Sequence, residues 1–274
     1  MKKLLGFVLS IFGLFLVFNL VVEPMIEPGM LYAPTKTIIS NPDPEVFDYE
    51  EVSLLSKNGK KLDGWFFTNR GSQKVILYLH GNAKNISSSI SLYAIKTFYH
   101  LPANVFIFDY QGFGRSEGVP SEENIYNDAE AAYAFLRKKG FDDRDIILVG
   151  NSLGGAVATY LASRHEVRAL VLQRSVSSVA DMAVRKNPLF RFPLVWFRSR
   201  FNTVEMIKSV KAPVLIVHSK QDEYVPYYMG VKIYNSFPGK KKMITIPTGT
   251  HYDEDVFVPE YIQSLKVLMK TGHF

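Results

Sequence analysis

Hydrophobic positions follow two different patterns along the chain. Alternating runs from Phe47 to Leu55 and from Lys61 to Phe67 flank Asn58-Gly59, a dipeptide that supplies the positive φ angles of a tight hairpin turn. Beyond residue 70 the apolar runs are short and continuous, and longer segments with helical spacing separate them. These runs are Val75–Leu79, Val105–Phe108, Ile146–Val149, Ala169–Leu172, Val214–Val217 and Met243–Ile246. The pattern predicts an α/β fold in which an antiparallel hairpin leads into a mostly parallel sheet with helices on both faces.

The spacing of these runs also predicts the domain organisation. Helical periodicity is clearest over Ser121–Lys139 and Gly154–Arg164. The stretch from Leu172 to Val214 is longer than one crossover needs, so we expect a helical cap-like insertion at about residues 173–211. We therefore expect one catalytic domain over residues 30–274, preceded by a separate segment of 29 residues.

The N-terminal segment resembles a membrane anchor. Lys2 and Lys3 precede an apolar run from Leu4 to Val22, which approaches the ~20 residues needed to cross a bilayer. The run ends in Glu23-Pro24 without a small-x-small cleavage site. We therefore prefer a retained signal-anchor, with a removed signal peptide as the alternative. The two lysines favour a cytoplasmic N-terminus, which would put the catalytic domain on the periplasmic or extracellular side if the organism is a bacterium.

Composition and charge narrow the possible chemistry. The chain has 274 residues and no cysteine, which excludes thiol catalysis, zinc–thiolate sites and a lipoprotein anchor. The formal charge is +6, and basic residues interleave with aromatic ones between Arg185 and Arg200. This segment is either a helix with solvated arginines over a buried aromatic face or a membrane-contacting surface. No nucleic-acid-binding motif accompanies it, and we expect no nucleic-acid partner.

A candidate nucleophile follows the apolar run Ile146–Val149. The next residues, Gly150-Asn151-Ser152-Leu153-Gly154, form a Gly-x-Ser-x-Gly pattern that leads into a helix of small residues. A sharp strand-to-helix turn of this kind exposes the serine hydroxyl above the sheet, and its glycines allow neighbouring backbones to approach closely. Ser152 is therefore the predicted nucleophile.

A serine hydroxyl needs a base that is oriented by a carboxylate. Asp222 follows the apolar run Val214–Val217, and His251 follows the run that ends at Ile246. Both positions lie where the carboxyl ends of parallel strands meet. The chain order serine, acid, base is the one expected for this architecture, and Glu223 is the alternative acid.

Acyl transfer also needs two backbone donors where negative charge develops. The residue after the nucleophile supplies one of them, the Leu153 N–H. The loop His80-Gly81-Asn82-Ala83, after the run Val75–Leu79, supplies the second, which we assign to Asn82 with Ala83 as its neighbour. We expect structural roles for His80, and for Asp109 at the start of a glycine-rich turn.

Together these motifs resemble the α/β-hydrolases. The similarity is strongest to small membrane-anchored serine hydrolases, a group that includes α/β-hydrolase-domain depalmitoylases and bacterial relatives. It extends from about residue 30 to the C-terminus. The motifs are Leu31-Tyr32-Ala33-Pro34, Leu62-Asp63-Gly64-Trp65-Phe66, His80-Gly81-Asn82-Ala83, Asp109 to Gly118, Gly150 to Gly155, and the loops of Asp222 and His251.

The resemblance implies a serine hydrolase of esters or thioesters that requires no metal or cofactor. Ser152, Asp222 and His251 carry over as nucleophile, acid and base. Aromatic residues in the insertion suggest acyl-lipid or acylated-protein substrates. The pocket candidates are Ala83, Arg174, Phe190, Trp196 and Tyr224. A serine peptidase or amidase, and a non-catalytic membrane-tethered interaction module, remain as alternatives.

Overall fold

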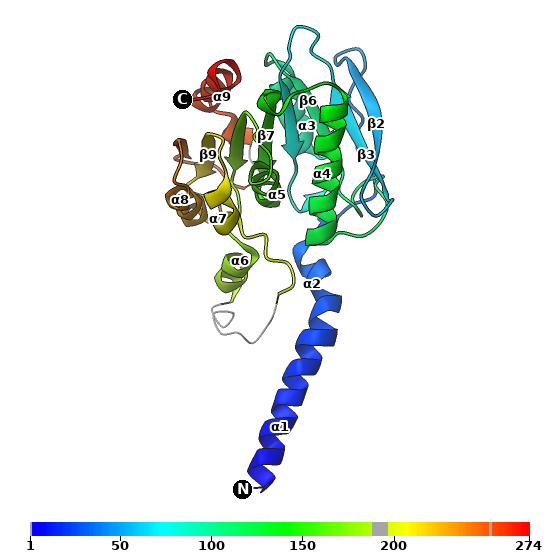
Figure 1. The fold of residues 1–274 in the computed structure, drawn as a ribbon, viewed down its shortest axis with the longest axis vertical. Coiled ribbons are helices and arrows are strands. Elements are labelled where there is room, and N and C mark those ends of the chain that lie inside the picture. The colour runs from blue at the N-terminus through cyan, green and yellow to red at the C-terminus, as the bar shows by residue number, and fades with distance from the viewer. Residues whose placement is uncertain (1, 188–196, 252–253) are drawn as a thin grey trace.

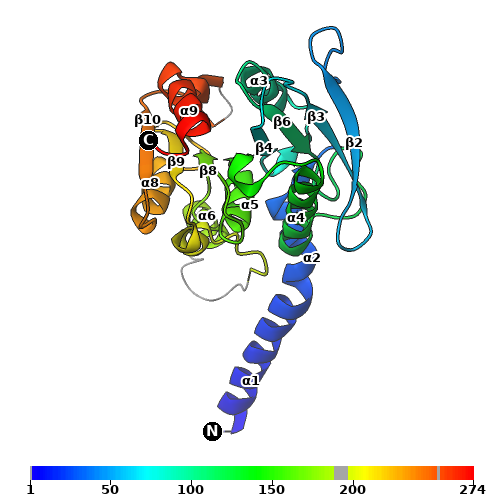
Figure 2. The same ribbon diagram turned by 45° about the horizontal axis from the view of Figure 1, so that its top comes forward.

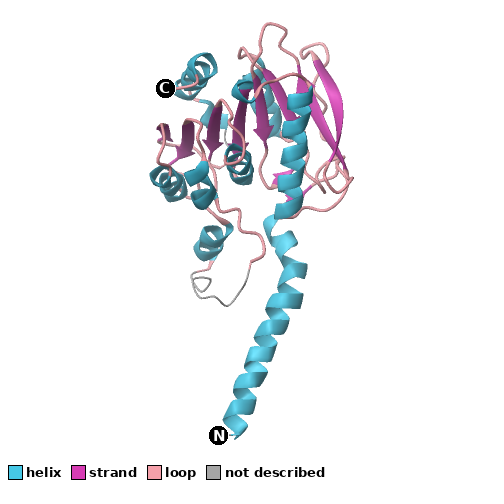
Figure 3. Ribbon diagram, in the orientation of Figure 1, coloured by secondary structure: helices cyan, strands magenta, loops and turns pink. Residues whose placement is uncertain are grey.

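The computed structural model describes residues 2–187, 197–251 and 254–274. Figure 1 shows a domain built around one sheet, from which a long N-terminal helix projects. Helices cover both faces of this sheet, as the colouring by secondary structure in Figure 3 makes clear. This arrangement confirms the α/β architecture predicted from the hydrophobic pattern.

The main sheet has eight strands in the order β10-β9-β8-β7-β4-β6-β3-β2. Only β3 runs against its neighbours, and the other adjacent pairs are parallel. The strands are β2 (Tyr49–Leu55), β3 (Lys61–Phe67), β4 (Val75–Leu79), β6 (Asn104–Phe108), β7 (Ile146–Asn151), β8 (Ala169–Gln173), β9 (Val214–Ser219) and β10 (Lys241–Ile246). The hairpin β2–β3 and the six predicted strands are confirmed, with boundaries that differ by two residues or fewer.

Two apolar cores lie on the two faces of the sheet, and the period-2 geometry of the strands divides side chains between them. Val75, Leu77 and Leu79 of β4 pack toward the first core, whereas Ile76 and Tyr78 pack toward the second. The first core includes α4 (Glu122–Lys138), α5 (Leu153–Ala162) and α8 (Tyr227–Ser236). The second includes α3 (Ser89–Tyr99), η5 (Glu254–Phe257) and α9 (Pro259–Thr271). A further 3₁₀ turn, η2 (Asp143–Asp145), precedes β7.

The insertion between β8 and β9 contains helices, as predicted. It begins with α6 (Val179–Lys186) and ends with α7 (Thr203–Met206) and the 3₁₀ turn η4 (Ile207–Ser209). In Figure 1, α6 lies apart from the two helical layers, whereas α7 lies beside α8. Within the described part of this insertion, α6 is therefore the helix that stands over the end of the sheet. We call residues 173–211 the cap.

The N-terminal segment is helical from Lys2 to Leu31. It consists of α1 (Lys2–Val17), the π-helical turn η1 (Phe18–Val22) and α2 (Glu23–Leu31). Within the described residues no one helix is both long and apolar enough to cross a membrane, but residues 9–22 and 25–31 together reach that length across a bend of 58°. A short strand, β1 (Ala33–Pro34), then pairs in parallel with β5 (Ala83–Lys84). Figures 1 and 2 both show α2 and α6 at the same end of the domain.

Candidate active site

Ser152 occupies the sharp turn between β7 and α5. Its φ and ψ of 54° and −119° are unusual for a residue other than glycine and typical of strain held at a functional position. Glycine is required on both sides of this turn. A Cβ on Gly150 would lie 2.2 Å from the Gly154 carbonyl oxygen, and one on Gly154 would lie 2.0 Å from the Leu79 carbonyl oxygen. The pattern Gly-x-Ser-x-Gly is therefore explained by backbone contacts.

A chain of hydrogen-bonding atoms connects Ser152 to a histidine and a carboxylate. Ser152 Oγ lies 3.1 Å from His251 Nε2, and His251 Nδ1 lies 2.8 Å from Asp222 Oδ2. All three residues are at least 95% buried. The other carboxylate oxygen of Asp222 accepts the N–H groups of Tyr224 and Val225 at 2.9 and 2.7 Å. Because a carboxylate can only accept, Nδ1 carries the proton and Nε2 can accept from the serine hydroxyl.

The loop that carries His251 is held by two neighbouring side chains. Arg174 Nη1 donates to the His251 carbonyl oxygen at 2.7 Å, and the His251 N–H donates to Glu223 Oε2 at 3.2 Å. Glu223, the alternative acid, thus contacts the backbone of His251, whereas Asp222 contacts its ring. The geometry favours Asp222 as the carboxylate that orients the imidazole.

The loop after β4 places Asn82 beside Ser152, at the border of the cleft. His80 Nδ1 donates to the Gly81 carbonyl oxygen at 2.8 Å. This carbonyl and the Asn82 N–H belong to the same peptide unit, which is trans, so they point in opposite directions. His80 therefore fixes the direction of the Asn82 N–H. The second predicted donor, the Leu153 N–H, lies at the first residue of α5, where helical N–H groups have no partner within the helix.

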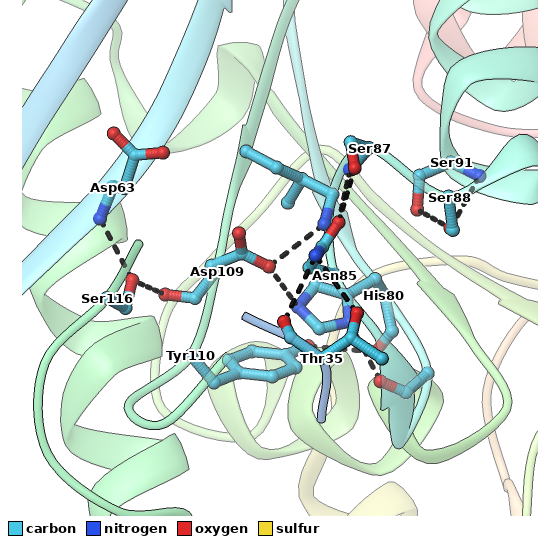
Figure 4. A network of polar contacts seen from close by, with 12 residues as sticks. Thr35, Asp63, His80, Asn85, Ser87, Ser88, Ser91, Asp109, Tyr110 and Ser116 are labelled. Carbon is cyan, nitrogen blue, oxygen red and sulfur yellow. Dashed lines mark hydrogen bonds and ion pairs between the residues drawn. The ribbon is translucent and has the colours of Figure 1, made fainter. Parts of the chain in front are cut away.

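Figure 4 shows a buried polar network behind this loop. Asp109 is fully buried, and its Oδ1 accepts the Ile86 N–H at 2.9 Å and lies 3.6 Å from His80 Nε2. Burial lowers the pKa of His80 to about 4 and raises the pKa of Asp109 well above its usual value. A neutral His80 that keeps its proton on Nδ1 suits the hydrogen bond to Gly81. The network supports structural roles for His80 and Asp109.

Asn85 extends this network to the strap of residues 35–37 that follows β1. Its amide donates to the carbonyl oxygens of Thr35 and Thr37 at 3.0 and 2.8 Å. Its oxygen accepts from the N–H and the hydroxyl of Ser87 at 2.9 and 2.6 Å. These hydrogen bonds join the N-terminal strap to the segment that follows the Asn82 loop.

Two clefts meet at Ser152, and they differ in chemical character. The first contains about 760 Å³ of space, part of it open to solvent. Most of its lining is apolar, and it includes side chains from α2 and α6 together with Leu153. The second contains about 540 Å³ and is lined by His251, the Asn82 loop and several serines at the start of α3. Ser152 and Asn82 border both clefts, whereas His251 borders the second and Leu153 the first.

The predicted pocket residues lie in different places. Ala83 lines the second cleft, and Tyr224 lines the first with its ring centroid 5.3 Å from that of His251. Arg174 lines neither cleft. It is 1% exposed, and its side chain extends beneath the loop of His251. Phe190 and Trp196 lie outside the described residues.

The contribution of α2 to the first cleft was not predicted from the sequence. Glu27, Met30 and Leu31 line this cleft together with Ser152. A possible signal was Glu27 itself, an acidic residue close to an otherwise apolar run. In the part of the chain that the structure describes, no group of three or more His, Asp or Glu residues is arranged to hold a metal ion.

Comparisons with known proteins identify the family of the fold. The family model described as the alpha/beta hydrolase fold matches residues 74–201. The alpha/beta hydrolase domain-containing protein WAV2 of Arabidopsis thaliana is 32% identical over 231 residues, which cover 75% of this chain and 73% of that protein. YfhR of Escherichia coli K12 is 30% identical over 253 residues, which cover 89% of this chain and 87% of that protein. Among solved structures, the esterase Pf2001 of Pyrococcus furiosus has a TM-score of 0.74 at 20% identity, covering 88% and 97% of the two chains.

Proposed function

The chain belongs to the α/β-hydrolase superfamily, and on that premise we propose that it is a serine hydrolase of carboxylic esters or thioesters. One observation carries the proposal: Ser152, His251 and Asp222 form a continuous chain of contacts of 3.1 and 2.8 Å at the junction of two clefts. The structural neighbour Pf2001 of Pyrococcus furiosus is an esterase, which supports ester substrates in particular.

The reaction follows from the positions of these groups. Ser152 Oγ attacks the carbonyl carbon while His251 Nε2 takes its proton, and the N–H groups of Asn82 and Leu153 stabilise the resulting oxyanion. When the tetrahedral intermediate collapses, the C–O or C–S bond breaks and the leaving group takes the proton from Nε2. Water then repeats the sequence on the acyl-enzyme, which releases the acid and restores the Ser152 hydroxyl.

The same chemistry assigns the two clefts. The leaving group must reach the proton on His251, and His251 lines the second, more polar cleft. The acyl chain then occupies the first cleft, where Val176, Val179 and Val225 are buried apolar neighbours. An acyl substituent with substantial apolar surface is therefore the substrate half that this site favours.

Labelling with a fluorophosphonate tests the proposal. We expect the native protein to form a stoichiometric adduct in which phosphorus is bonded to Ser152 Oγ and fluoride has left. Peptide mass spectrometry locates the adduct, and heat-unfolded protein serves as the control because its serines lack an activating base. A folded protein that forms no adduct, or one modified on another residue, would contradict the proposal and favour a non-catalytic role.

We further propose that the helical segment beginning with α1 attaches the enzyme to a membrane, with the N-terminus cytoplasmic and the domain on the opposite side. The support is the surface of α1, where large apolar side chains project on all sides. Phe7, Leu9, Ile11, Phe12, Leu14 and Val17 are each more than half exposed. A helix that is apolar all round and not covered by protein is suited to a lipid environment. Acyl-lipid or acylated-protein substrates would be available at such a surface.

Flotation with phosphatidylcholine vesicles tests this attachment. The full chain is expected to float with the vesicles, and the double variant Ile11→Asp, Leu14→Asp is expected to stay at the bottom of the gradient. An aspartate in the middle of a bilayer helix costs about 2.5–3.5 kcal/mol on insertion scales. Ile39→Asp is the matched control, because Ile39 is 70% exposed but belongs to the domain. Wild-type protein that does not float would overturn the attachment.

A further inference from the structure

The last turn of α2 forms one wall of the first cleft, which we call the acyl cleft because it is proposed to hold the acyl chain. Met30 and Leu31 line this cleft directly. From the cap, α6 contributes Val179, Met182, Ala183 and Lys186. Ser152 therefore shares one cleft with apolar side chains from both helices.

Glu27 attaches this wall to the cap. Its two carboxylate oxygens accept the N–H groups of Arg198 and Ser199 at 2.6 and 2.7 Å, and the residue is only 4% exposed. Hydrogen bonds to an ionised acceptor are among the stronger ones, particularly in a buried setting. The position of α2 relative to the end of the cap is thus held by two contacts between segments about 170 residues apart in the chain.

The end of α2 is also attached to the Asn82 loop, which carries one of the two proposed oxyanion donors. The Asn82 side-chain amide donates to the Leu31 carbonyl oxygen at 2.7 Å, and the Ala33 N–H donates to the Asn82 carbonyl oxygen at 2.9 Å. The contact between these two segments extends further along the chain, where the Thr35 N–H donates to the Lys84 carbonyl oxygen at 3.1 Å. The wall is therefore aligned with the reacting centre at one end and with the cap at the other.

Met30 lies where the cleft opens. It lines the cleft and yet is 52% exposed, and on the same helix Met25 and Ile26 are 77% and 44% exposed. An acyl chain that fills the cleft would leave it across Met30. Figures 1 and 2 show that α1 departs from the domain at this same end.

We infer that α2 is the wall that selects the acyl chain, with Met30 as a specificity-determining residue at its mouth. The inference rests on the proposed hydrolase function and names its substrate class: esters or thioesters of long, unbranched acyl chains. Each methylene that becomes buried against this wall is expected to raise kcat/KM roughly fourfold. The gain should end where the chain passes beyond Met30 into solvent.

Met30→Gln tests the assignment, with Met25→Gln as the matched control on the same helix. Glutamine is similar in length to methionine but carries a polar amide, so it weakens contact with an acyl chain without filling the cleft. The quantity measured is the ratio of kcat/KM for the dodecanoyl to the acetyl p-nitrophenyl ester, with full-length protein in detergent. We expect Met30→Gln to lower this ratio roughly tenfold and Met25→Gln to leave it within twofold of wild type.

The outcomes separate this inference from the proposed function. An unchanged ratio in Met30→Gln, or an equal loss in Met25→Gln, would overturn the role of Met30. A wild-type enzyme that is labelled by the fluorophosphonate but does not distinguish the two esters would overturn the acyl wall and leave the hydrolase proposal intact. Failure of the proposed function is recognised separately, because folded protein would then remain unlabelled.

Discussion

Replacing Ser152 by alanine is expected to lower kcat for a carboxylic ester by at least about 10⁴-fold. The variant keeps the backbone donors of Asn82 and Leu153 and both clefts, so substrate binding should persist. It lacks the Oγ that forms the acyl-enzyme. Without that atom, only direct attack by water on the bound ester remains, and this reaction gains little from His251 in its present position.

The measurement is single-turnover and steady-state hydrolysis of a p-nitrophenyl ester. Ser163→Ala is the control, because Ser163 lies at the opposite end of α5 and its hydroxyl donates to the Tyr160 carbonyl oxygen. Circular dichroism and thermal unfolding establish that both variants are folded. A Ser152→Ala protein that retains a burst of p-nitrophenol would show that another residue is the nucleophile.

Much of the fold could be predicted because its signals are local in sequence. Buried parallel strands appear as short apolar runs whatever lies between them, and Val75–Leu79 is found with the predicted boundaries. The candidate site follows from the same property. Ser152, Asp222 and His251 each lie within five residues of the end of such a strand, and the carboxyl ends of parallel strands lie at one edge of the sheet.

Features formed by distant segments could not be predicted in this way. The role of α2 in the acyl cleft depends on contacts of Glu27 with Arg198 and Ser199, which no periodicity in either segment indicates. Arg174 illustrates the converse. Its place after β8 suggested a pocket residue. Its φ of 48° and its hydrogen bond to the His251 carbonyl oxygen instead put the side chain beneath the loop that carries His251. Side-chain direction at a strained strand end is decided by tertiary contacts.

Asp222→Asn should have the second large effect, and it should act through the tautomer of His251. Asp222 Oδ1 accepts from the N–H groups of Tyr224 and Val225, so the oxygen of the new amide keeps that position. Its NH₂ group then faces His251 Nδ1, which must become an acceptor. The proton moves to Nε2 and points at Ser152 Oγ, which leaves no base to take the serine proton.

We expect the Asp222→Asn substitution to lower kcat by about 10⁴-fold with little change in KM, as for a triad whose histidine is held in the wrong tautomer. Glu223→Gln is the control. Among the described residues, the Glu223 side chain accepts the backbone N–H of His251 at 3.2 Å, and an amide oxygen can still accept that bond. Its kcat should therefore stay within about fivefold of wild type, because losing one charge from a hydrogen bond of this length is a small change. The two variants are compared by steady-state kinetics on the same ester. The reverse order of effects would assign the acid to Glu223, because the ring of His251 would then have to turn toward that side chain during the reaction.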